Sequence, residues 1–160
     1  MMKNSNVHVA NDDNKVSMKD IKNRADIEQI VSDFYDQVLV DPIVGFIFTN
    51  VVTINLVTHL PIIVNFWADL VLQDSTERLY HGNALQTHLK INALISLKPG
   101  HFTRWLFLFS NAIDRHYAGP KATLMKARAS GIAQSISAAI TDQKKSDMRL
   151  TLSSWNETSS

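Results

Sequence analysis

The chain contains no cysteine, and only four prolines and five glycines occur among its 160 residues. The lack of cysteine excludes disulfides, iron–sulfur ligation, thiolate zinc sites and thioether attachment of a cofactor. It also fits a reducing cytoplasm, which is the compartment we expect. With few prolines and glycines and an apolar share of 45%, the composition is typical of an ordered globular protein.

Long runs of one charge and long apolar runs are missing as well. The formal net charge is +1 and the basic residues form no cluster, so the sequence favours neither a nucleic acid nor an anionic lipid as partner. Residues 1–20 lack the apolar core of a signal peptide. The most apolar stretch, Val51–Leu72, is broken by Asn55, His59, Asn65 and Asp69 and is too polar to cross a membrane. The sequence therefore predicts a soluble protein with no membrane partner.

Polar ends flank a patterned centre. Residues 1–20 are polar without periodicity and predict a mobile N-terminal arm, and residues 142–160 predict a polar C-terminal tail rich in Ser and Thr. Residues 21–141 form the predicted domain, which is long enough to bury a core and a small cofactor.

Apolar residues with helical spacing dominate this domain. No stretch alternates as a strand would, so we predict an all-α fold. Asp26 favours the start of the first helix and Asp41-Pro42 ends it. A short helix is expected over Asn83–Leu89. The long apolar faces are Ile27, Ile30, Val31, Phe34 and Val38; Leu56, His59, Leu60, Ile63, Phe66, Trp67 and Leu70; Phe102, Trp105, Leu106, Phe109 and Ile113; and Ala122, Met125, Ala129, Ile132, Ala133, Ile136 and Ile140.

Two segments of this domain need separate interpretation. Residues 43–48 read as a short apolar turn, and residues 73–82 as a polar loop. Pro61 lacks an N–H and clashes with the preceding turn of a helix, so we expect the regular second helix to begin close to Pro61. His59 would then lie at the helix entrance.

Three of the six histidines have simple structural interpretations. His8 lies in the N-terminal arm and is expected to be solvated. His101 is expected to cap or orient the third helix. His116 lies near the end of that helix, where a cation favours the helix dipole.

His59, His81 and His88 remain as candidate metal ligands. Their spacing does not match a zinc-binding helix, and a histidine on an apolar face is usually a satisfied core residue. His59 and His88, however, are expected to face inward from separate helices beside large aromatic residues. Two such histidines suit a haem slot, in which one coordinates iron and the other meets the ligand.

An ordered set of residues runs through the chain from about Asp26 to Ile140. Its members are Phe34-Tyr35, Asp41-Pro42, Gly45, Phe48, His59, Phe66-Trp67, Tyr80, Gly82, His88, His101-Phe102 and Arg104-Trp105-Leu106. This ordered set resembles the group III truncated haemoglobins. The resemblance implies a shortened globin fold, in which two antiparallel helix pairs form a two-over-two sandwich around haem b.

The same resemblance implies roles for individual residues. His88 is the implied proximal iron ligand, with Leu85 beside it. Tyr35, His59 and Trp105 are the implied distal residues that meet the gas ligand. The implied haem wall consists of Phe48, Ile63, Phe66 and Trp67. Core packing is the alternative role for the two tryptophans, and satisfying a buried backbone group is the alternative for Tyr35.

The resemblance implies oxygen binding or transport, with reversible binding of O₂, CO or NO at a penta-coordinate iron. The alternatives are a redox enzyme (an NO dioxygenase or a peroxidase-like enzyme) that needs a separate electron donor such as a reductase, and a haem-free helical interaction module.

No Asp or Glu lies between Glu77 and Asp114. A peroxidase-like proximal histidine usually bonds a carboxylate, which raises its basicity. In this chain we expect the second ring nitrogen of His88 to donate to a local carbonyl such as that of Ala84, which favours ligand binding over peroxide activation. The cations in this region are candidates either for pairing with haem propionates or for a solvated face; they are Arg78, His81, Lys90, Lys98 and Arg104.

Overall fold

The computed structural model describes residues 17–74 and 76–157, with side chains as far as residue 149. Residues 1–16 of the predicted N-terminal arm lie outside this range. The described residues form helices and contain no strand, so the all-α prediction is confirmed. None of the helices in this range is both long enough and apolar enough to cross a membrane.

Helix α1 (Arg24–Val38) has Asp26 in its first turn, which agrees with the prediction that Asp26 favours the start of this helix. The Asn23 side chain accepts the N–H of Asp26 at 3.1 Å, and the Asp26 carboxylate accepts the N–H of Lys22 at 2.8 Å. Two of the N–H groups at this helix end are thereby satisfied. The apolar face of α1 is buried, as its spacing predicts.

A π-helix, η1 (Ile47–Val51), begins within the apolar turn that the sequence predicts over residues 43–48 and includes its last two residues. Gly45 allows this turn to approach the end of α1, because a Cβ at Gly45 would lie only 3.0 Å from the carbonyl oxygen of Val38. The segment therefore folds back tightly onto α1.

Helix α2 (Leu56–Val71) begins five residues before Pro61, so the prediction that the regular helix starts near Pro61 is wrong. Asn55 provides the helix cap by accepting the N–H of Val57 at 3.1 Å. Proline removes the hydrogen bond that the Val57 carbonyl would accept, but Val57 is 85% exposed and water can satisfy that oxygen. His59 consequently lies in the first turn of the helix.

Helix α3 (Ala84–Leu94) is longer than the predicted Asn83–Leu89 and has no buried residue. Asn83 caps it by accepting the N–H of Gln86 at 3.0 Å. The predicted polar loop precedes it.

Helix α4 (Pro99–Asp114) starts with a proline in its first turn. The Nδ1 atom of His101 accepts the N–H of Lys98 at 3.0 Å, which confirms that His101 caps this helix. His116 lies beyond the helix end, and its Nε2 atom is 2.6 Å from Oδ2 of Asp33. The sequence predicts that His116 caps α4. His116 instead joins the end of α4 to α1, because the Asp33 carboxylate lies within hydrogen-bond reach.

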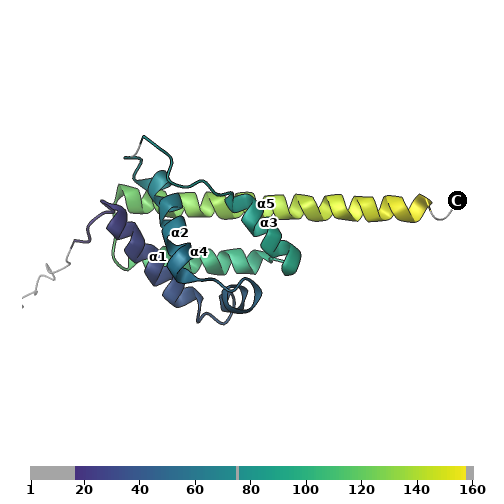
Figure 1. Ribbon diagram of the computed structural model, residues 1–160, viewed down its shortest axis with the longest axis horizontal. Helices are drawn as coiled ribbons and strands as arrows, with labels where there is room; N and C mark the ends of the chain where they lie inside the picture. The colour runs from purple at the N-terminus through teal and green to yellow at the C-terminus, as the bar shows by residue number, and fades with distance from the viewer. Residues whose placement is uncertain (1–16, 75, 158–160) are drawn as a thin grey trace, which may run out of the picture.

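Helix α5 (Pro120–Glu157) includes the predicted fourth apolar face and continues through most of the predicted polar tail. Figure 1 shows α4 and α5 side by side, with the yellow end of α5 projecting beyond the other helices. The last buried residue of α5 is Ile136 among those whose side chains are described.

The core lies where the pair α1–α2 packs against the pair α4–α5. Trp67 of α2 stacks on Phe109 of α4 with 4.8 Å between ring centroids, and Phe34 of α1 meets Phe109 edge-on at 5.3 Å. Aromatic pairs of this kind stabilise a core beyond the area that they bury. This arrangement is the two-over-two sandwich that the resemblance implies.

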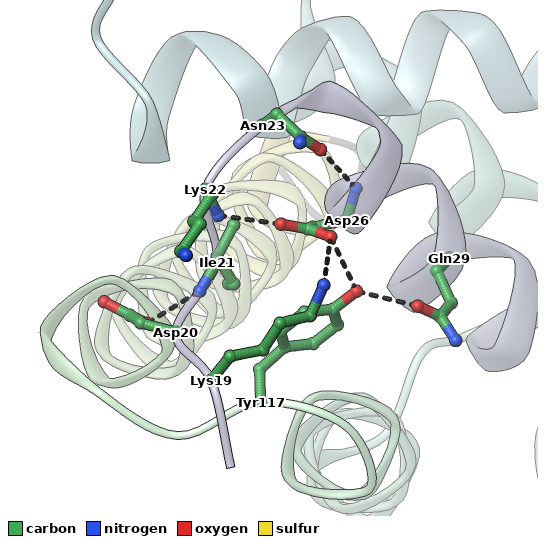
Figure 2. Close-up of polar contacts among 8 residues, drawn as sticks. All are labelled: Lys19, Asp20, Ile21, Lys22, Asn23, Asp26, Gln29 and Tyr117. Carbon is green, nitrogen blue, oxygen red and sulfur yellow. Dashed lines mark hydrogen bonds and ion pairs between the residues drawn. The ribbon is translucent and has the colours of Figure 1, made fainter.

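Polar contacts attach the segment before α1 to the first turn of α1 and to Tyr117 (Figure 2). The buried Asp26 carboxylate lies 3.0 Å from the Tyr117 hydroxyl and 3.3 Å from Nζ of Lys19. Burial, with the adjacent Asp26, raises the pKa of Tyr117 to about 12. Asp20 accepts the N–H groups of Lys121 and Ala122, both at 2.9 Å, and so caps α5. Residues 19 and 20, at the end of the predicted arm, are thus bound to the domain.

Candidate functional site

His88 lies in the middle of α3 and is half-buried. Its Nδ1 atom is 2.6 Å from the carbonyl oxygen of Ala84, one helical turn earlier. A carbonyl oxygen can only accept, so Nδ1 is the donor; in the neutral imidazole the lone pair is then on Nε2, the nitrogen that can bind a metal. The predicted bond between the His88 ring and Ala84 is confirmed.

The surface around His88 is apolar but poorly covered by protein. Leu85, one turn before His88, is 41% exposed, while Leu89 and Ile91 are half-buried. Helix α3 packs mainly against α5. The residues beside His88 therefore include one exposed and two half-buried apolar side chains that a flat apolar group such as a porphyrin could contact.

Tyr35 and His59 meet at a second part of the site, on α1 and α2. The Tyr35 hydroxyl is 2.9 Å from Nε2 of His59, and the two rings meet edge-on at 5.7 Å. Burial raises the pKa of Tyr35 well above its ordinary value and lowers the pKa of His59. Both side chains are therefore neutral near pH 7 and share one hydrogen bond. Either the Tyr35 hydroxyl or the Nε2–H group of His59 is its donor, depending on the tautomer of His59.

Trp105 of α4 belongs to an aromatic cluster next to this pair. Its ring stacks on Phe109 at 5.2 Å and meets Phe34 edge-on at 5.9 Å. Phe34 in turn contacts the Tyr35 ring, and Phe48 meets Tyr35 edge-on at 6.0 Å. The structure thus gathers the predicted distal residues into one aromatic region.

The remaining predicted wall residues lie on α2. Phe66 and Ile63 are half-buried, whereas Trp67 is only 3% exposed and also serves the core through its contact with Phe109. Phe66 meets the Tyr80 ring edge-on at 5.1 Å. His88 stands on α3 and the distal residues on α1, α2 and α4, so the predicted ligand and the predicted gas-binding residues come from different helices.

Arg104, one candidate for pairing with a propionate, is bound to a carboxylate of the protein. Its Nε and Nη2 atoms lie 2.8 and 2.7 Å from Oδ2 of Asp41. The guanidinium holds the pKa of the Asp41 carboxyl below its usual range. The other four candidates, Arg78, His81, Lys90 and Lys98, are exposed. Sequence reasoning missed the Asp41–Arg104 pair, because 63 residues separate its members.

A groove of about 520 Å³ lies apart from these residues, between the start of α4 and the middle of α5. Phe102 and Leu106 line one side and Ala133 and Ser137 the other, and none of the predicted site residues lines it. Within the described residues, no three His, Asp or Glu side chains are close enough to hold a metal ion by themselves. Haem iron needs only one protein ligand, so a single histidine suffices.

Comparison with known proteins supports the same fold. No family model and no curated protein sequence matches the chain. A solved structure, the group III truncated haemoglobin from Campylobacter jejuni, matches with a TM-score of 0.66 and 26% sequence identity, over 78% of this chain and 95% of that chain.

The chain is therefore an all-α protein with a truncated globin fold. Its resemblance to the group III truncated haemoglobins, which the ordered set of residues indicates, is confirmed by this match.

Proposed function

We propose that this protein is a haem-binding globin that reversibly binds O₂, CO or NO. His88 is the proposed iron ligand and haem b the proposed cofactor. The observation that carries the proposal is the bond from Nδ1 of His88 to the Ala84 carbonyl, because it makes Nε2 the metal-binding nitrogen of the neutral ring, next to the exposed Leu85. Haem supplies a penta-coordinate iron with one open position for a diatomic ligand.

Leu85 would lie against the haem on the proximal side. Phe48, Ile63, Phe66 and Trp67 would contribute the remaining apolar wall, and the half-buried state of Ile63 and Phe66 supports this role. Apolar walls exclude water and hold the flat ring by contact area.

The distal residues would select among gases by hydrogen bonding. Tyr35 offers an O–H group, Trp105 an indole N–H group, and His59 either a donor or an acceptor. The neutral Tyr35–His59 pair keeps the hydroxyl satisfied when no ligand competes for it. A gas ligand that develops partial negative charge would attract these donors, so the pocket favours O₂ over a less polar ligand such as CO.

The proximal hydrogen bond favours ligand binding over redox catalysis. His88 bonds a carbonyl, which is a weaker acceptor than a carboxylate and raises the basicity of the imidazole less. An NO dioxygenase or peroxidase-like activity would need a separate electron donor, such as a reductase. Turnover assays with NO and peroxide distinguish these activities from simple gas binding. We propose the cytoplasm as the site of action.

Replacement of His88 tests the assignment of the iron ligand. We expect purified wild-type protein to show a Soret band and, in the ferrous state, a low iron–histidine stretching frequency typical of globins. His88→Gly should lose haem and with it the Soret band, and added imidazole should restore both. His81→Ala removes the competing candidate ligand, an exposed histidine of the preceding loop, and should keep the Soret band and the iron–histidine stretching band.

Two outcomes would contradict the proposal. Full retention of haem with an unchanged stretching band in His88→Gly would show that another residue holds the iron. A high stretching frequency together with rapid peroxide turnover would favour the enzyme instead.

A further inference from the structure

Asp69 of α2 holds the loop that leads into α3. Its Oδ2 atom accepts the N–H of Tyr80 at 2.8 Å and its two oxygens accept the N–H of Leu79 at 3.0 and 3.1 Å. These are charge-assisted bonds to main-chain groups, which are stronger than neutral ones and fix the backbone itself. The carboxylate therefore attaches the end of the loop directly to α2.

A second contact on the same face of α2 reinforces this attachment. Phe66 lies three residues before Asp69, and its ring meets the Tyr80 ring edge-on at 5.1 Å. Tyr80 is thus held by its backbone N–H and by its side chain.

Gly82 makes room for this position of Tyr80. A Cβ at Gly82 would lie 2.5 Å from the Tyr80 hydroxyl oxygen and 2.6 Å from Cζ. With any larger residue at position 82, the end of the Tyr80 side chain or the backbone at position 82 would have to shift.

Only seven residues lie between Tyr80 and His88, and the last five of these belong to α3 or to its cap. Asn83 follows directly after Gly82 and caps α3 by accepting the N–H of Gln86 at 3.0 Å. The next residue, Ala84, supplies the carbonyl that orients the His88 ring at 2.6 Å. The place of Ala84 therefore depends on the loop that Asp69 holds.

Asp69 brings a carboxylate close to a part of the chain that has none of its own. No Asp or Glu occurs from residue 78 to residue 113, and Asp69 approaches this stretch from α2. It accepts main-chain N–H groups there, so it acts on the backbone before α3.

We propose that Asp69, together with Tyr80 and Gly82, is a positioning element that sets the separation of α3 from α2 and so the place and orientation of His88. Helix α3 packs mainly against α5, and the Asp69 contacts supply its link to α2. This inference rests on the proposed role of His88 as iron ligand. Asp69 itself touches neither haem nor gas.

The test compares Asp69→Asn and Gly82→Ala with wild type, all as haem-loaded full-length protein. Asn keeps one acceptor oxygen but presents an NH₂ group to a backbone N–H, whereas Gly82→Ala moves Tyr80 without any change of charge. We expect both variants to release haem faster, by roughly three- to tenfold, since residues that orient a metal ligand typically contribute 10–100-fold and Asp69 acts one step further away. We also expect the iron–histidine stretching band to broaden or shift.

Matched controls separate this effect from general loss of stability. Asp36→Asn makes the same change of charge at an exposed position of α1, and Gly131→Ala adds a Cβ where no atom lies within 4 Å. Both should keep the wild-type stretching band and rate of haem release. A purely structural role would lower the unfolding temperature of Asp69→Asn and Gly82→Ala without any change of the band.

Wild-type haem release and an unchanged band in both Asp69→Asn and Gly82→Ala would overturn the inference. Failure of the proposed function looks different, because His88→Gly would then retain haem and its stretching band. The two failures are therefore distinguishable.

Discussion

The Tyr35 hydroxyl oxygen lies 2.9 Å from Nε2 of His59, which is hydrogen-bond distance. Tyr35 is buried, and burial lowers the pKa of His59 and so keeps its imidazole neutral. Each partner satisfies the other without a charge. The pair therefore keeps a hydrogen-bond donor in an apolar region without burying a charge. Substitution of Tyr35 or of His59 tests the pair.

Tyr35→Phe removes the donor and keeps the ring. If Tyr35 stabilises a polar gas ligand, O₂ should dissociate about tenfold faster or more, because one hydrogen bond contributes about 1.4 kcal/mol. Stopped-flow measurement of O₂ release checks this. Release of CO, which attracts a donor less, is the internal control and should change much less. Equal changes for both gases would show that the hydroxyl acts on access and not on ligand polarity.

The lowered pKa of His59 predicts a pH dependence of stability. Burial lowers this pKa from its ordinary value of 6.5. Between 6.5 and the folded pKa, His59 therefore binds a proton in the unfolded chain but not in the native protein. His59 should therefore destabilise the native state as the pH falls below 6.5 and until the folded pKa is reached, and it should have no effect at higher pH.

Urea unfolding of wild type and His59→Gln over a pH series measures this contribution. Glutamine keeps a polar group but does not titrate, so the difference between the two free energies of unfolding isolates His59. A difference that does not vary with pH would contradict the predicted burial of the imidazole.

Asp41→Asn should destabilise the protein by removing the charge that pairs with Arg104. The Asp41 side chain is 2% exposed and that of Arg104 is 31% exposed, so we expect about 2 kcal/mol, less than for a fully buried pair. The lowered pKa of Asp41 means that the wild-type contribution is present above the ordinary value of 3.8 and is lost as the pH falls through the folded pKa. Denaturant titration at neutral and acidic pH tests both statements, with Asp36→Asn as the exposed control.

Gly119→Ala should destabilise the start of α5. Gly119 has a φ of +146°, and a Cβ there would lie 2.5 Å from Cγ of Asp20. The substitution strains the backbone and displaces the Asp20 cap, which together should lower the free energy of unfolding by about 2 kcal/mol. Gly131→Ala, in open space within the same helix, should instead raise it by up to about 1 kcal/mol. Thermal unfolding of the two variants should therefore move in opposite directions.

Local patterns in the sequence predict most of the helices. The apolar spacing from Ile27 to Val38 and the position of Asp26 suffice for α1, because both act within a few residues. The Ala84 carbonyl bond of His88 is predictable for the same reason, since it spans one helical turn. The expected start of α2 near Pro61 is wrong because Val57 is exposed, so the carbonyl that Pro61 leaves without a helical N–H is open to solvent.

Contacts between distant parts of the chain could not be predicted in this way. The pairs Asp33–His116 and Asp41–Arg104 join residues that are 83 and 63 positions apart. Nothing in the spacing of Asp69 indicates that it binds the loop before α3. The roles of individual haem-pocket residues come from the resemblance, and they stay predictions until the experiments above are done.

The length of α5 has a consequence for how the molecule moves in solution. Its 38 residues correspond to about 57 Å at 1.5 Å per residue, and Figure 1 shows the C-terminal part reaching past the rest of the fold. The hydrodynamic behaviour should therefore be that of an elongated particle, with rotation about the long axis faster than end-over-end tumbling. Nitrogen-15 relaxation rates should then depend on the angle between each N–H vector and the axis of α5, and removal of the residues after 141 should make tumbling nearly isotropic.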